Sequence, residues 1–203
     1  MKKIPVLFER IYNDFGRVCG ITREVRPGME WVLDGSGDAT VKWDGTATMY
    51  KDCVFYKRYD AKHGKPVPEN AIKCQDEADP ITGHLPCWVP VDENDPGDRW
   101  ILQAMKNYIA AGNQMENWTY EAVGPHINSS PYDMEEETLI PHGREVIEVE
   151  RSFDGIKKYL EDHYIEGIVF WKDGEPKCKI RRKDFGLFWK SGKKKIKQDT
   201  KQA

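Results

Sequence analysis

Residues 166–182 read EGIVFWKDGEPKCKIRR. Two runs, residues 167–172 and 175–182, flank the dipeptide Asp173-Gly174. An Asp-Gly pair between apolar runs is the strongest short signal for a β-hairpin, because both residues readily adopt the positive φ that its turn needs. The segment therefore predicts a pair of antiparallel strands.

Further short β-rich runs precede this hairpin, at residues 39–42, 46–50, 53–59, 118–123 and 138–140. The second and third of these runs are expected to form a tight hairpin across Lys51-Asp52. Residues 62–96 show few periodic signals and are expected to form an irregular insertion with one strand around residues 88–91.

Two segments carry apolar residues at helical spacing. The first is expected to begin with Asp98 as its cap, run to Ala111 and stop at Gly112. The second spans residues 152–163, with Ser152 as its cap. Together these elements predict an α+β domain dominated by antiparallel sheet, with flanking helices.

Length and composition limit the classes of protein to which the chain can belong. The chain has 203 residues, 39% hydrophobic and 32% charged, which is enough for one substantial core. No apolar run is long enough to cross a bilayer, and the N-terminal apolar run is too short for a secretory signal. Five cysteines form no CxxC pair, which favours a reducing, cytoplasmic location.

Charge is distributed unevenly along the chain. Residues 177–203 contain eleven Lys or Arg and two acids, whereas the whole chain has a net charge of −3. We therefore expect one domain over residues 1–192 and a basic tail over residues 193–203. Such an end is typical of contact with a polyanion, although a solvated Lys-rich tail without a partner is equally consistent with the charge alone.

The first chemical motif is Lys42-Trp43-Asp44-Gly45-Thr46, at the end of an expected strand. A neutral lysine is a nucleophile, and neighbouring cations together with partial burial favour its neutral form. Gly45 permits a sharp turn and a close approach of the backbone to a ligand. Taken alone, the motif is more simply interpreted as a surface lysine followed by an Asp-Gly turn.

Two carboxylates lie in apolar surroundings. Glu121 falls within the apolar run of residues 118–123, where an unpaired charge would be costly. Either an ion pair or hydrogen bonds from ribose hydroxyls would account for it. Glu166 precedes a strongly apolar strand and is a candidate Mg²⁺ ligand, since that ion binds a few carboxylates together with substrate phosphates.

Two lysines alternate on the last expected strand. Lys177 and Lys179 are two residues apart, so a regular strand would place both ammonium groups on one face. Like charges side by side are costly unless an anion lies between them, and a triphosphate is such an anion.

In this order, the four motifs resemble those of the covalent lysyl-nucleotidyltransferase superfamily, which includes ATP-dependent DNA ligases, RNA ligases and mRNA capping enzymes. The resemblance runs from about residue 39 to residue 182. It implies a nucleotidyltransferase (ATP-grasp-like ligase) domain built of antiparallel sheets with flanking helices.

A closer resemblance is to the 5′-to-3′ RNA ligase family that includes the vertebrate RNA ligase. It rests on HLPCWVPV (84–91), YEAVGPHINSSPYD (120–133), LIPHG (139–143), EGIVFW (166–171) and KIRRKDFGL (179–187). The resemblance implies ATP as the nucleotide, Mg²⁺ (with Mn²⁺ as a substitute) as the metal, and RNA with 5′-phosphate and 3′-hydroxyl ends as the substrate. It also implies a role in RNA repair. The sequence itself gives no indication of a membrane or of an obligate protein partner.

The resemblance also implies residue roles. Lys42 corresponds to the adenylated nucleophile, Glu121 to the ribose contact and Glu166 to the metal-linked carboxylate. Lys179, with Lys177 beside it, corresponds to the α-phosphate contact.

Three further points concern the match to the family. Arg58 corresponds to an arginine near the phosphates and the reacting RNA end. The chain ends soon after the last motif, so we expect no OB-fold domain, and Lys62 or the lysines of residues 190–201 would have to orient the pyrophosphate. Ile140-Pro141-His142 stands where other ligases offer an aromatic ring to the base.

Two other functions share part of this pattern. A capping-type RNA guanylyltransferase has the same motifs but transfers GMP, and a non-catalytic RNA-binding relative would keep the fold without the chemistry. Cys74, His84 and Cys87 fit no standard zinc spacing and lack a clear fourth ligand, so ordinary loop residues are favoured there.

Overall fold

The C-terminal hairpin forms as the sequence predicts. The computed structural model describes residues 1–62, 65–80, 82–128 and 131–189, so the expected basic tail lies outside the described residues. Strands β10 (Gly167–Lys172) and β11 (Glu175–Arg181) pair antiparallel across a turn in which Asp173 and Gly174 have φ of 54° and 73°. Strand β3 (Asp38–Lys42) pairs with the other edge of β10 and completes a three-stranded sheet.

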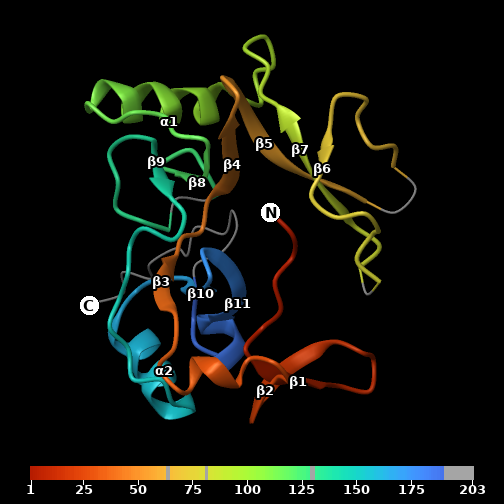
Figure 1. The fold of residues 1–203 in the computed structure, drawn as a ribbon, viewed down its shortest axis with the longest axis vertical. Coiled ribbons are helices and arrows are strands. Elements are labelled where there is room, and N and C mark those ends of the chain that lie inside the picture. Colours follow the sequence, from red (N-terminus) through yellow and green to blue (C-terminus); the bar gives the residue numbers. More distant parts are fainter. Residues whose placement is uncertain (63–64, 81, 129–130, 190–203) are drawn as a thin grey trace, which may run out of the picture.

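A second sheet has six strands in the order β6-β7-β5-β4-β8-β9. Their bounds are β4 Thr46–Lys51, β5 Val54–Ala61, β6 Ile72–Lys73, β7 Leu85–Pro90, β8 Trp118–Val123 and β9 Thr138–Pro141. Helix α1 (Arg99–Ala110) contacts β8 and β9, and its apolar residues share a core with this sheet. Figure 1 shows the six-stranded sheet above and the three-stranded sheet below, with the chain passing from β3 directly into β4.

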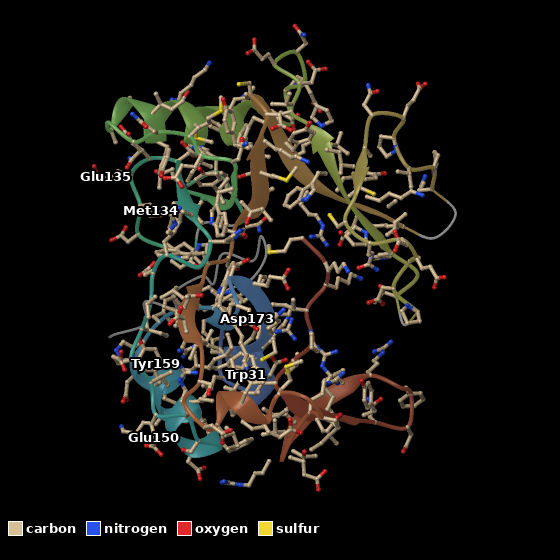
Figure 2. The ribbon with its side chains drawn as sticks, viewed as in Figure 1. Trp31, Met134, Glu135, Glu150, Tyr159 and Asp173 are labelled. Carbon is tan, nitrogen blue, oxygen red and sulfur yellow. The ribbon has the colours of Figure 1, made fainter. Side chains whose placement is uncertain are left out.

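The three-stranded sheet has its own apolar core. Helix α2 (Phe153–Asp162), the hairpin of β1 (Phe8–Tyr12) and β2 (Val18–Val25), and the 3₁₀ turns η1 (Glu30–Val32) and η2 (Arg182–Phe185) surround it. Figure 2 shows Tyr159 and Glu150 at α2 in the lower half, and Met134 and Glu135 ahead of β9 in the upper half. The segment between β9 and α2 therefore joins the two halves.

Every pairing between named strands of the described residues is antiparallel, which confirms the expected α+β class. Three local predictions were wrong. The β4–β5 turn lies at Asp52-Cys53, where φ is 50° and 64°, one residue later than expected. The strand expected around residues 88–91 is present as β7, but the described part of residues 62–96 holds a second strand, β6, and the two strands extend the sheet from β5.

The third correction concerns the start of α1. Asp98 precedes the helix, but its side chain makes no capping hydrogen bond. Instead its carboxylate binds the Lys57 ammonium and accepts a hydrogen bond from the Asp92 amide at 3.0 Å. Ser152 does cap α2, accepting a hydrogen bond from the Gly155 amide at 2.9 Å.

Candidate active site

A cavity of about 210 Å³ opens where the two sheets meet. Its lining combines residues of β3, β10 and β11 with residues of β4, β5 and β8 and with the segment after β9. Four of the six expected site residues line it: Lys42, Arg58, Glu121 and Lys179. Residues 1–4 also line the cavity, and Figure 1 shows the N-terminal segment running down beside β11 to β1.

The Lys42 ammonium is in contact with the Glu166 carboxylate, in the position that sheet pairing dictates. Gly167 pairs with Lys42 across β10 and β3, so Glu166 lies beside the end of β3. The two side chains are 23% and 12% exposed. Burial raises the pKa of Glu166, and the charge of Lys42 opposes that rise. The expected nucleophile and the expected metal-linked carboxylate therefore form a largely buried ion pair.

Lys179 is a second cation beside this pair. Burial, followed by the charges of Lys42 and Arg181, lowers its pKa to about 8. An anion in the cavity would offset this unfavourable concentration of positive charge. Lys179 is therefore a cation at the cavity that an anionic ligand would stabilise.

Lys177 lies elsewhere. A β-bulge shifts the register, because Phe170 pairs with Cys178 whereas Trp171 pairs with Pro176. Lys177 forms an ion pair with Glu175 at 2.5 Å and is not among the described residues that line the cavity. The bulge breaks the regular alternation from which a shared face with Lys179 was expected.

Glu121 is held by two donors. Its carboxylate accepts a hydrogen bond from the Gly45 amide at 3.0 Å, and its other oxygen lies 2.9 Å from His142 Nε2. His142 also contacts Thr119 Oγ1 through Nδ1, at 3.0 Å. From the sequence, His142 was expected to stand where other ligases have an aromatic ring. No spacing in the sequence predicted its contact with Glu121.

Arg58 lies on β5 of the six-stranded sheet, where it lines the cavity and is held by hydrogen bonds. Its Nε donates to Asp60 at 2.8 Å, and its Nη1 donates to the Met1 carbonyl at 2.8 Å. Its guanidinium also lies 5.9 Å from the ring centre of Trp88. Arg58 therefore joins the N-terminal segment to the cavity wall, although the sequence indicated no partner for it.

The residues after Lys42 are fixed by contacts that the sequence did not reveal. The Asp44 amide donates to Tyr132 Oη at 2.6 Å, and the Asp44 carboxylate accepts from Trp189 Nε1 at 2.8 Å. Gly45 lies so near β8 that a Cβ built on it would be 2.1 Å from the Ala122 carbonyl oxygen. Gly45 is thus required for close strand packing, whatever its role toward a ligand.

Two features are absent from the described residues. Within them, no group of three or more His, Cys, Asp or Glu side chains is arranged to hold a metal ion, and Cys74, His84 and Cys87 form no such group. No helix in the same part of the chain has the length and apolar character needed to cross a membrane.

Comparison with known proteins points to one kind of relative. No family model matches the chain. The chain is 25% identical to RNA ligase 1 of Danio rerio, over 65% of this chain and 46% of that protein. It is 26% identical to RNA ligase 1 of Pongo abelii, over 66% of this chain and 47% of that protein. The chain spans about half the length of these curated relatives, and its sequence is distantly related to RNA ligase 1.

Proposed function

We propose that this chain is an ATP-dependent RNA ligase that works through a lysyl-AMP intermediate. The observation that carries the proposal is the contact of Lys42 with Glu166, beside Lys179, at a cavity between two sheets. A binding module has no need for a lysine amine held among other charges at a cavity. The distant relationship to RNA ligase 1 supports RNA as the substrate class.

In the first proposed step, the Lys42 amine attacks the α-phosphorus of ATP. A P–N bond forms, the bond from the α-phosphorus to the β-phosphate oxygen breaks, and pyrophosphate leaves. The ammonium proton must depart before the attack, and Glu166 is in direct contact with that group. Lys179 and Arg58 then lie along the cavity wall, where they can neutralise charge that develops on the phosphates.

AMP next passes to the 5′-phosphate of RNA. A 5′-phosphate oxygen attacks the α-phosphorus, the P–N bond breaks, and Lys42 regains its amine. A 3′-hydroxyl then attacks the RNA 5′-phosphate, AMP leaves, and a phosphodiester bond forms. In this proposal the Glu121 carboxylate accepts hydrogen bonds from the ribose, and its contacts with Gly45 and His142 share its lone pairs or give way.

A Mg²⁺ ion fits the chemistry of these groups. Glu166 is buried with its pKa raised, so a nearby cation stabilises its carboxylate form. One carboxylate plus substrate phosphates is the environment that Mg²⁺ prefers, and the ion would neutralise phosphate charge there. Mn²⁺ can take the same ligands.

Intact mass spectrometry tests the proposal. Incubation with ATP and Mg²⁺ is expected to add one AMP to the protein, and the Lys42→Arg variant, which keeps the positive charge beside Glu166, is expected to add none. A GMP adduct formed only from GTP would instead identify a capping-type guanylyltransferase. No adduct from either nucleotide would favour a non-catalytic RNA-binding protein.

A further inference from the structure

A cluster of aromatic rings lies next to the proposed nucleophile but outside the cavity. Trp189 packs against Tyr164, with ring centres 4.9 Å apart, and against Tyr132, at 5.9 Å. Tyr132 in turn packs against Trp43, at 4.7 Å. We call Tyr132, Tyr164 and Trp189 the aromatic platform. None of the three is among the described residues that line the cavity.

The platform is tied to the residues around Lys42. Trp189 Nε1 donates to the Asp44 carboxylate at 2.8 Å, and Asp44 is two residues beyond Lys42. Tyr132 Oη accepts from the Asp44 amide. These two contacts place the platform next to the reacting lysine and explain why an indole and a phenol are held at this position.

Part of the platform is open to solvent although it is rigidly supported. Tyr164 is 49% exposed, and the neighbouring Phe188 is 61% exposed. Beneath Tyr164 lies the buried Arg182, whose guanidinium is 5.4 Å from the ring centre and donates to the carbonyls of Leu160, His163 and Phe188. A half-exposed aromatic ring that its neighbours support can offer its open surface to a flat partner.

A further cation, Lys183, directly follows Arg182 in the chain. Lys183 lies in η2, on the segment that leads to Trp189. Burial and the charge of Arg181 lower its pKa, and Glu166, Asp184 and Lys42 also act on it. Within the described residues, Lys183 Nζ makes no hydrogen bond or ion pair. Its charge is therefore available to an anionic ligand near Glu166 and Lys42.

We propose that Tyr164, Trp189 and Lys183 form a binding site for the 5′-terminal nucleotides of single-stranded RNA, with the rings stacking on bases and Lys183 contacting the phosphate backbone. Exposed aromatic faces beside a cation are the usual means of holding single-stranded nucleic acid. The inference rests on the proposed ligase function, because that function requires a 5′-phosphorylated strand to reach the adenylated Lys42. The bases would lie on the platform while the 5′-phosphate approaches the cavity.

Binding of a short, 5′-phosphorylated, 3′-fluorescein-labelled RNA, measured by anisotropy without ATP, tests the site. Tyr164→Ala is expected to weaken binding about tenfold, since stacking of one base contributes about 1–3 kcal/mol. Tyr164→Phe keeps the ring and should bind within about twofold of the parent. Tyr12→Ala is the matched control, because Tyr12 on β1 is also 49% exposed.

Lys183→Gln gives an independent readout. It is expected to weaken binding and to reduce the slope of log affinity against log salt by about 0.7, the value for one phosphate contact to a single strand. Lys106→Gln, an exposed position on α1, is the control and should leave the slope unchanged. A 5′-phosphorylated DNA of the same sequence shows whether the 2′-hydroxyl contributes.

The outcomes separate this inference from the ligase proposal. Unchanged affinity in Tyr164→Ala, or equal losses in Tyr164→Phe and Tyr164→Ala, would overturn the stacking site. If Tyr164→Ala loses lysyl-AMP formation by the same factor as RNA binding, the ring is merely structural and the inference fails. A protein that binds RNA through Tyr164 yet never forms lysyl-AMP would retain the site and refute the ligase.

Discussion

Lys179 carries its charge where the surrounding protein disfavours it. Its pKa of about 8 is below the ordinary 10.5, so between these values the unfolded chain binds more protons than the native protein. Stability due to this group therefore rises with pH across that window. We expect Lys179→Met to be more stable than the parent by about 3 kcal/mol below pH 8, with the difference vanishing towards pH 10.5.

Urea unfolding at pH 6.5 and pH 10, together with the AMP-adduct assay, measures both consequences. The variant should gain stability and lose adenylation, because the buried charge is kept for an anion rather than for the fold. A variant less stable than the parent at pH 6.5 would show that Lys179 contributes favourably to folding, and the phosphate role would lose its main physical argument.

Glu166 differs from Lys179, because a neighbouring charge, that of Lys42, stabilises its ionised form. Lys42→Ala leaves a buried carboxylate without its cation, which costs about 1–3 kcal/mol. Without Lys42, the pKa of Glu166, which burial already raises, rises further. Protonation of Glu166 therefore relieves the loss of stability at low pH, and the full loss is present only above that raised pKa. Thermal unfolding should show a larger deficit at pH 8 than at pH 5, and Lys42→Arg should show little deficit at either. Equal deficits at both pH values would argue against the ion pair.

At the scale of elements, the residues that precede the two helices make different interactions. Ser152 caps α2 through one hydrogen bond, and Ser152→Ala should cost about 1 kcal/mol. Asp98, 2% exposed, binds Lys57 instead of capping α1, so Asp98→Asn should cost about 3 kcal/mol by leaving that lysine without its buried partner. Urea midpoints of both variants test the ranking. Equal costs would mean that Asp98 contributes no more than a cap.

Local signals predicted the elements well wherever one residue pair or period determined them. Asp173-Gly174 specified the turn of β10–β11, and helical spacing located α1 and α2. The β1–β2 hairpin escaped prediction because its pairing has irregular register and its strands are largely exposed, so no clean alternation appears in the sequence.

The sequence singled out individual residues of the cavity lining, but it did not predict the contacts between them. Apolar surroundings marked Glu121 and Glu166 as unusual, and the structure places both near Lys42. Because of one β-bulge, Lys177 does not line the cavity, and no pattern in the sequence predicted this bulge. Contacts such as His142 with Glu121 and Trp189 with Asp44 join segments far apart in the chain, which only the tertiary fold brings together.

At the scale of the whole molecule, the cavity draws its lining from both sheets, each of which has its own apolar core. A nucleotide bound there would contact both halves and should stabilise them together. With Lys42→Arg, which should bind ATP without forming an adduct, ATP and Mg²⁺ at about 100 times the dissociation constant should add about 2.7 kcal/mol. For a chain of this size that corresponds to a rise in Tm of about 5–10 °C.

Differential scanning calorimetry measures this shift and its cooperativity. A single unfolding transition that moves to higher temperature would mean that the nucleotide links the two cores. A ligand held by only one sheet would instead raise the unfolding temperature of that half and leave the other half unchanged. Lys42→Arg combined with Glu121→Ala removes one proposed contact from the six-stranded sheet and should reduce the shift. An unchanged melting curve under conditions in which the parent protein forms lysyl-AMP would place the nucleotide outside this cavity.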